Sequence, residues 1–144
     1  MCRLRCLARR RSAQGIPADV GIGTIDQAFL AELPAKYQSL RLLGLAERVL
    51  IVDEAHAYDA YMERELERLL QFQAALGGSA IVLSATLPRA VRQPLATAFA
   101  KGLCREPPVL RALDYPLVTV VAASGGQEEA KAPRVDLRRT IDIE

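Results

Sequence analysis

Two short apolar runs, each followed at once by polar residues, constrain this chain more than any other feature. Val-Leu-Ile-Val at positions 49–52 and Ala-Ile-Val-Leu at positions 80–83 are typical of strands buried on both faces of a parallel sheet. Between them, tyrosine, methionine and leucine recur at helical spacing, and Gly77-Gly78 stops that helix. A strand, a helix and a strand in this order form a βαβ unit, whose two strands pair in parallel.

A helical region is predicted before the first strand, over about residues 21–48. Thr24 and Gln27 have the spacing of a capping box, in which a hydroxyl and an amide bond to the free N–H groups at a helix start. An apolar face follows, and Pro34 is expected to end this helix. Leucines at positions 40–45 predict one more short helical turn.

One more helix and one more strand are predicted after the second apolar run. The helix spans residues 89–101 and is closed by Gly102. Pro94 marks either a kink in this helix or its true start. Leu-Val-Thr-Val-Val at positions 117–121 has the composition of a strand. The fold class is therefore α/β.

By composition the chain divides into residues 1–20, 21–121 and 122–144. The first part is basic and irregular, with five arginines before its first acid, and is interpreted as a loose, solvated end. A basic arm that touches phosphate is the alternative interpretation. The second part holds the predicted α/β elements. The third begins with a Gly- and Glu-rich stretch at 124–133, predicted to be a flexible linker, and continues into a possible terminal strand at 135–143.

Composition excludes some classes of function and leaves others open. The chain of 144 residues has room for one modest domain or a piece of a larger one. Its net charge of +2 is too small to indicate nucleic acid or a membrane by itself. No apolar stretch approaches the ~20 residues of a membrane span. Three cysteines at no zinc spacing and a single histidine favour free thiols in a reducing compartment, so we expect a cytoplasmic protein without membrane contact.

Polar side chains follow both predicted strands at the point where each strand ends. Asp53 and Glu54 come directly after the first strand, and Ser84 and Thr86 follow the second. Because ligands bind outside the carboxyl ends of parallel strands, these groups are expected to line one site. Asp53 would hold Mg²⁺ through a water molecule, and Glu54 would position or deprotonate an attacking water. His56 is close enough in sequence to meet Ser84 or Thr86 across the two strands.

Simpler interpretations exist for each of these residues. Asp53 and Glu54 could cap a helix, since acids favour helix N-termini, and Thr24 could be only a cap. The apolar stripe from Tyr58 to Leu76 is interpreted as core packing. The arginines at positions 41, 89 and 92 are interpreted as ordinary surface charges.

Four sequence blocks carry a resemblance to a known family. They read Gly-Thr-Ile-Asp-Gln at 23–27, Leu-Arg-Leu-Leu-Gly-Leu at 40–45, Ile-Val-Asp-Glu-Ala-His-Ala-Tyr-Asp-Ala-Tyr-Met at 51–62, and Leu-Ser-Ala-Thr-Leu-Pro at 83–88. Asp-Glu-Ala-His followed by Ser-Ala-Thr resembles the second and third motifs of superfamily 2 helicases. The four blocks together resemble the CRISPR-associated DEAH-box helicase of type I interference systems, which acts in antiviral defence.

The resemblance covers roughly residues 18–120 and implies a fold and a set of roles. It implies a partial RecA-like parallel sheet with flanking helices, an incomplete domain of the P-loop NTPase type. It implies ATP and Mg²⁺ as cofactors, with Asp53, Glu54 and His56 in the metal, catalytic and coupling positions. Ser84 and Thr86 would link the nucleotide state to strand movement, and Gly23 and Thr24 would touch single-stranded DNA.

The partners that the resemblance implies lie outside these 144 residues. They are the remaining helicase domain, an HD-type nuclease domain and an RNA-guided interference complex. The sequence also departs from the family, because it has no Gly-x-x-x-x-Gly-Lys-[Ser/Thr] loop to cradle phosphates. We therefore expect a gene fragment or one piece of a split helicase, inactive alone. A non-catalytic α/β module that binds nucleic acid or serves as a scaffold is the alternative, and a DEAH-box enzyme acting on RNA is a narrower one.

Overall fold

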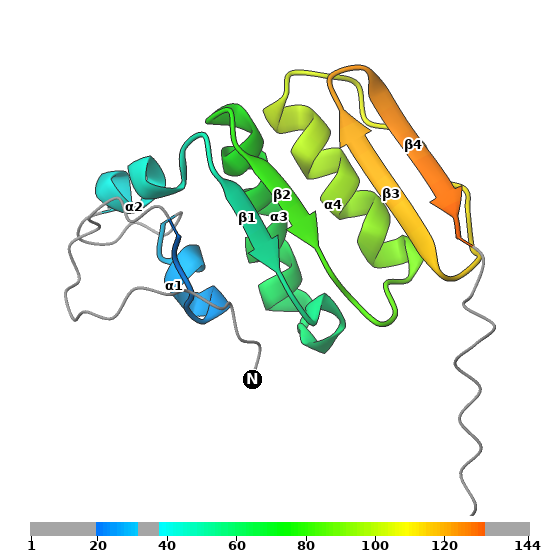
Figure 1. The fold of residues 1–144 in the computed structure, drawn as a ribbon, viewed down its shortest axis with the longest axis horizontal. Helices are drawn as coiled ribbons and strands as arrows, with labels where there is room; N and C mark the ends of the chain where they lie inside the picture. Colours follow the sequence, from blue (N-terminus) through cyan, green and yellow to red (C-terminus); the bar gives the residue numbers. More distant parts are fainter. Residues whose placement is uncertain (1–19, 32–37, 132–144) are drawn as a thin grey trace, which may run out of the picture.

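The two apolar runs form the parallel strand pair that the sequence predicts. In the computed structural model, which describes residues 20–31 and 38–131, β1 (Val49–Val52) pairs with β2 (Ser79–Val82). The register places Ile51 beside Ile81 and Val52 beside Val82. The crossover helix α3 (Ala60–Ala75) covers one face of this pair, so the βαβ prediction is confirmed (Figure 1).

Helix α3 is capped at both ends by the residues expected of a helix terminus. The Asp59 carboxylate accepts hydrogen bonds from the N–H groups of Tyr61 at 3.0 Å and Met62 at 2.8 Å. At the other end, Gly77 has a φ of +75°, a left-handed conformation that glycine adopts without strain. Between the caps, one face of the helix is buried: Leu66, Leu69, Leu70, Gln73 and Ala74.

Helix α4 (Arg89–Gly102) packs against α3 along its length. It begins at Arg89, so Pro94 lies inside the helix and is not its start. At the C-terminal end of α4 the two helices approach so closely that only glycine fits. A Cβ atom on Gly102 would lie 2.2 Å from the carbonyl oxygen of Gln71 on α3.

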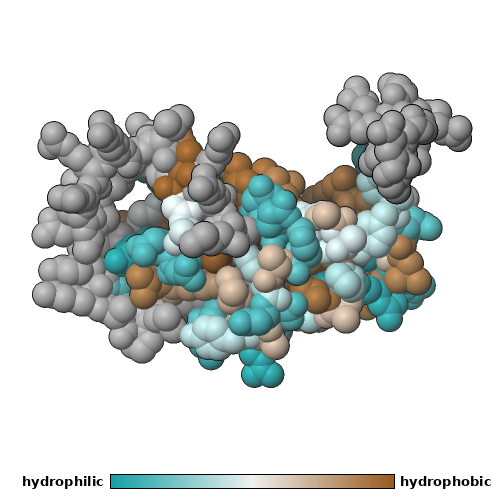
Figure 2. Space-filling model, turned by 90° about the horizontal axis from the view of Figure 1, so that it is seen from below, coloured by the Kyte–Doolittle hydropathy of each residue, from teal (hydrophilic) through white to brown (hydrophobic). Residues whose placement is uncertain are grey.

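The core lies between the helices and one face of the β1–β2 pair. Leu50 and Val52 of β1 join buried residues of α1 (Ile25–Phe29), α3 and α4 in one apolar cluster. The opposite strand face is open, because Val49, Ile51 and Ile81 are 60%, 48% and 47% exposed. The prediction that both strands are buried on both faces is therefore wrong for the described residues. Apolar side chains also reach the surface among polar ones (Figure 2).

A hairpin follows α4 and corrects the linker prediction. The predicted strand is present as β3 (Leu117–Ala122), and it pairs antiparallel with β4 (Gly125–Ala130). The stretch 124–133 was predicted to be a flexible linker, and this is wrong for residues 125–130. Lys131 continues the pairing, since its N–H donates to the carbonyl of Pro116 at 2.8 Å.

The N-terminal helices are shorter than the sequence suggests. Thr24 is the N-cap of α1, as predicted, but its side chain makes no capping hydrogen bond. The leucine-rich turn is present as α2 (Gln38–Leu45). Pro34, the basic segment 1–19 and the predicted strand 135–143 lie outside the described residues. Among the described helices, none is long and apolar enough to cross a membrane.

Candidate functional site

The polar groups that follow β1 and β2 lie at one edge of the parallel pair. Two backbone hydrogen bonds continue the pairing beyond the strands: Leu83 N donates to Val52 O at 2.7 Å, and Ala55 N donates to Leu83 O at 3.1 Å. These bonds hold residues 53–56 beside residues 84–86. The prediction that the polar residues after the two strands lie at one edge of the parallel pair is therefore confirmed.

The two adjacent acids adopt different conformations at this edge. The Asp53 carboxylate accepts the N–H of Glu54 at 2.9 Å, and both side chains are exposed to solvent. Glu54 has a φ of 56° and a ψ of 39°, which is the left-handed region that only glycine and, less often, asparagine or aspartate occupy routinely. The short 3-10 helix η1 (Ala55–Ala57) follows directly.

His56 joins the groups that follow the two strands. Its Nδ1 atom lies 3.2 Å from Glu54 Oε2 and 3.3 Å from Ser84 Oγ. The Ser84 hydroxyl donates to the carbonyl of Thr86 at 2.9 Å, so its oxygen is left to accept a hydrogen bond. A hydrogen on Nδ1 satisfies both neighbours, since a carboxylate also accepts. The predicted contact between His56 and the second strand's motif is thus present, through Ser84.

The donor set at this edge suits a magnesium ion held mainly by water and phosphate. No group of three His, Cys, Asp or Glu side chains that could hold a metal is found among residues 20–31 and 38–131. Mg²⁺ in nucleotide sites uses one or two carboxylates together with waters and phosphate oxygens. The exposed carboxylates of Asp53 and Glu54 at this edge are compatible in number with this kind of ion.

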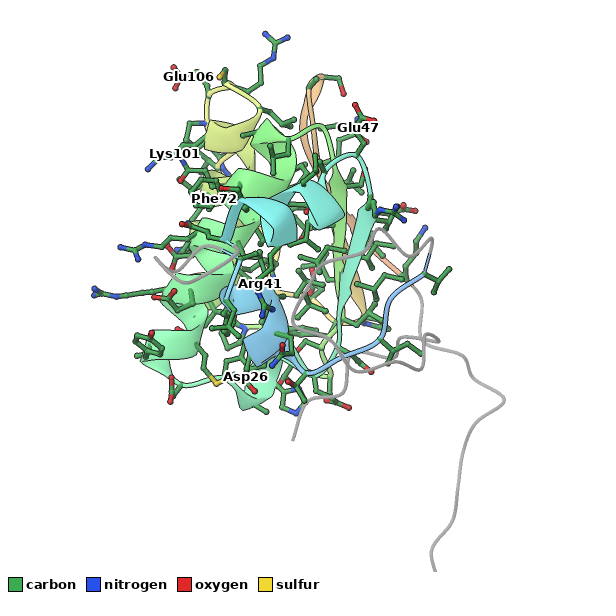
Figure 3. All side chains as sticks on the ribbon, turned by 90° about the vertical axis from the view of Figure 1, so that its left-hand side faces the viewer. Asp26, Arg41, Glu47, Phe72, Lys101 and Glu106 are labelled. Atoms are coloured by element: carbon green, nitrogen blue, oxygen red, sulfur yellow. The ribbon has the colours of Figure 1, made fainter. Side chains whose placement is uncertain are left out.

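Gly23 and Thr24 belong to the N-terminal part of the described chain. Both are exposed and directly precede α1, which packs against α3. Helix α2 lies next to α1, and the Nη1 of Arg41 donates to Gln27 Oε1 at 3.4 Å (Figure 3).

Two of the residues after the Asp-Glu-Ala-His motif make structural contacts. Tyr58 is 8% exposed and belongs to the core cluster, and Asp59 caps α3. Tyr61 is 61% exposed.

Sequence reasoning missed an ion pair near the Ser-Ala-Thr motif. Arg92 was interpreted as a surface charge, and this is wrong, because Arg92 is 7% exposed and pairs with Glu128 of β4 at 3.1 Å. The helical spacing carries a signal for its burial: Arg92, Leu95, Ala96 and Phe99 share one helix face. Nothing in the sequence identifies Glu128 as its partner, 36 residues away.

Comparison with known proteins places this arrangement in a family. The chain is 45% identical over 108 residues to the CRISPR-associated endonuclease/helicase Cas3 of Escherichia coli and 46% identical over 93 residues to that of Thermus thermophilus. These matches cover 75% and 65% of this chain. The chain is related to the CRISPR-associated Cas3 helicases. No family model matches it.

The similarity to Cas3 covers a small part of those proteins. The chain spans 12% of the length of the Escherichia coli relative and 10% of the Thermus thermophilus relative. A Cas3 from Streptococcus thermophilus is 40% identical over 85 residues, which are 59% of this chain and 9% of that protein.

Solved structures agree with the Cas3 relationship in fold. A CRISPR-associated protein superposes with a TM-score of 0.73 at 43% identity, over 81% of this chain and 13% of that one. The T. fusca Cas3–ATP structure has a TM-score of 0.67 at 41% identity, over 74% of this chain and 12% of its own. Cas3 of T. fusca is also described with AMPPNP and with ADP. A further match, with a TM-score of 0.64 and 39% identity over 74% of this chain, is a CRISPR RNA-guided surveillance complex before nicking.

Proposed function

We propose that this chain supplies part of the nucleotide-hydrolysis site of an ATP-dependent DNA helicase that acts in type I CRISPR interference. The observation that supports this most strongly is the contact of one histidine with both strand ends, Glu54 Oε2 at 3.2 Å and Ser84 Oγ at 3.3 Å. Coupling of ATP hydrolysis to movement requires contact between residues that act on the nucleotide and residues that respond to it. His56 makes such a contact between Glu54 and Ser84.

The edge residues divide the chemistry between them. Bound ATP and Mg²⁺ would supply the reacting phosphate and the charge that neutralises it. The Asp53 carboxylate faces solvent at the end of β1, where it would hold the ion through water. The Glu54 carboxylate would orient the attacking water and accept its proton. His56, Ser84 and Thr86 would transmit the state of this site to the segment that follows β2.

The DNA-binding role belongs to the N-terminal helix. Gly23 and Thr24 are exposed where α1 begins, and the Thr24 hydroxyl is not used as a cap. A hydroxyl and the N–H groups of a helix start are typical phosphate ligands. We assign residues 21–121 to an incomplete first RecA-like domain, which the β3–β4 hairpin extends to Ala130.

Turnover requires further polypeptide. These 144 residues contain no Gly-x-x-x-x-Gly-Lys-[Ser/Thr] loop, so the lysine and the N–H groups that cradle phosphates must come from elsewhere. The partners are therefore the remaining helicase and HD nuclease domains, single-stranded DNA and the RNA-guided interference complex. The second RecA-like domain would supply an arginine finger, and loss of such an arginine alone costs ~10³–10⁵ in rate. The isolated chain is therefore expected to have no measurable ATPase activity.

Complementation in trans tests this function. The chain is mixed with a polypeptide that carries a phosphate-binding loop and the second RecA-like domain, and ATP hydrolysis is measured with and without single-stranded DNA. We expect DNA-stimulated hydrolysis only in the mixture, lowered at least ~10²-fold by Glu54→Gln. Glu47→Gln is the matched control, because Glu47 has a similar φ of 57° but precedes β1, at the opposite end of that strand from Glu54.

Two outcomes contradict the proposal. Hydrolysis by the chain alone that Glu54→Gln abolishes shows that the site is complete. Binding of DNA by the mixture without any Glu54-dependent hydrolysis instead favours the non-catalytic module.

A further inference from the structure

The segment that contains the Ser-Ala-Thr motif is held by side chains from two other parts of the chain. Residues 84–88 lead from β2 into α4, and the carbonyl of Leu87 lies within this segment. That carbonyl accepts hydrogen bonds from Arg92 Nη1 at 3.3 Å and from Tyr115 Oη at 2.7 Å. Ser84 and Thr86 lie directly before it, so whatever fixes Leu87 also fixes the Ser84–Thr86 turn.

Arg92 carries this restraint across to the β3–β4 hairpin. Its Nη2 donates to the carbonyl of Ala112 at 2.6 Å and to Glu128 Oε1 at 3.1 Å. Only 9% of the Arg92 side chain is exposed, and 14% of the Glu128 side chain. A buried guanidinium needs a carboxylate and well-placed acceptors, so removal of Glu128 leaves a charge without its counter-ion.

Glu128 is itself fixed by backbone donors. Its Oε2 accepts the N–H groups of Arg111 at 2.6 Å and Ala112 at 3.0 Å. The Ala112 N–H lowers the pKa of the Glu128 carboxyl, burial raises it, and the Arg111 N–H and the Arg92 charge lower it further, so that the net pKa is below its ordinary value. The carboxylate is thus held in its charged form between Arg92 and the segment at 110–115.

One continuous network therefore connects His56 with β4. It runs from His56 to Ser84, along the backbone to Leu87, and through Arg92 to Glu128. We propose that Arg92 and Glu128 are positioning residues, which hold the Ser84–Thr86 turn against the β3–β4 hairpin so that a displacement at either end reaches the other. This inference rests on the proposed function, in which Ser84 and Thr86 transmit the state of the nucleotide site. The network connects these residues physically with the β3–β4 hairpin.

The single histidine of the chain provides a direct test, because its ring signals in an NMR spectrum have one possible source. Ring ¹⁵N spectra of the full chain, without a histidine tag, are compared for the parent and Glu128→Gln under identical conditions. We expect the variant to change the chemical shifts of the His56 ring nitrogens, because Ser84 Oγ moves away from Nδ1. Glu129→Gln is the matched control, since Glu129 is the next residue on β4 with its side chain 67% exposed, and its spectrum should equal that of the parent.

The outcomes separate positioning from simple stabilisation. If Glu128→Gln lowers the melting temperature but leaves the His56 signals of the folded chain unchanged, the pair only stabilises the hairpin and the proposal is overturned. If Glu128→Gln does not fold, Glu128→Asp replaces it, because the shorter side chain keeps the charge but withdraws the carboxylate from Arg92 Nη2. A parent-like spectrum from a folded Glu128→Asp then overturns the proposal. The NMR experiment uses no nucleotide, so its result does not depend on whether the ATPase complementation succeeds.

Discussion

Glu54 places the proposed catalytic carboxylate on a strained backbone. Its φ of 56° is unfavourable for a residue with a Cβ atom, at a cost of about 1–2 kcal/mol. Such strain persists where the surrounding structure fixes the backbone, and here the N–H of the next residue, Ala55, is bonded to Leu83. The conformation turns the chain sharply after β1 and brings His56 back toward the carboxylate, at 3.2 Å.

This strain predicts an order of stability for two variants of Glu54. Both Glu54→Gly and Glu54→Ala remove the carboxylate, but only glycine adopts the left-handed conformation without a Cβ clash. We expect Glu54→Gly to be more stable than Glu54→Ala by about 1 kcal/mol, measured by urea denaturation. At Glu63, in the first turn of α3, the same two substitutions should have the reverse order, because glycine weakens helices. Equal stability of the two Glu54 variants would show that the backbone relaxes.

The Glu128 carboxyl predicts a dependence of stability on pH. Because its pKa is lower in the folded chain than the ordinary 4.5, its ionised form stabilises the fold above about that pH, and this contribution is lost as the pH falls through the lowered value. Denaturation measured between about pH 6 and pH 3 should therefore show the parent losing stability faster than Glu128→Gln, so that the two curves converge in acid. A gap that stays constant over this range contradicts the assignment, and Glu129→Gln should follow the parent.

Glycine at the end of α4 decides how closely the two long helices can pack. A Cβ atom on Gly102 would lie 2.2 Å from the carbonyl oxygen of Gln71 and 2.7 Å from the Cβ of Ala74, so α3 and α4 would have to separate. We expect Gly102→Ala to lower the free energy of unfolding by about 1–3 kcal/mol, measured by urea denaturation.

Gly44→Ala is the matched control, with the opposite expected sign. Gly44 lies in helix α2 with no atom within 4 Å of its added Cβ, so alanine should stabilise the chain by about 0.5 kcal/mol through helix propensity. If both substitutions have the same sign, helix propensity rather than the α3–α4 approach explains the effect at Gly102.

The elements differ in how far the sequence could predict them. The βαβ unit follows from local signals, since β-branched runs, helical spacing and Gly77 all agree with the observed fold, and the contact of His56 with Ser84 follows from parallel pairing. Strand β4 could not be predicted, because Gly-Gly-Gln-Glu-Glu-Ala has low strand propensity. It is a strand because β3 supplies hydrogen bonds and Arg92 binds Glu128, which are contacts between distant parts of the sequence.

At the scale of the whole molecule, the parallel pair has one covered face and one open face. Parallel sheets normally have both faces covered. Here the face of the β1–β2 pair away from the core exposes apolar residues of both strands: Val49, Ile51 and Ile81. This open face is the largest difference between the described residues and what the two apolar runs predicted.

An open apolar face predicts self-association of the isolated chain. The paired residues Ile51 and Ile81 lie side by side at the centre of the β1–β2 face, and threonine keeps the strand propensity while adding a hydroxyl. Sedimentation velocity at increasing concentration should show association of the parent, and Ile51→Thr with Ile81→Thr should reduce it. Val109→Thr makes the same kind of change at a residue that is 75% exposed but lies outside the strands, so it should associate like the parent. A parent chain that stays monomeric at all concentrations would mean that the face is stable in water, and the exposed strands would then need no covering polypeptide.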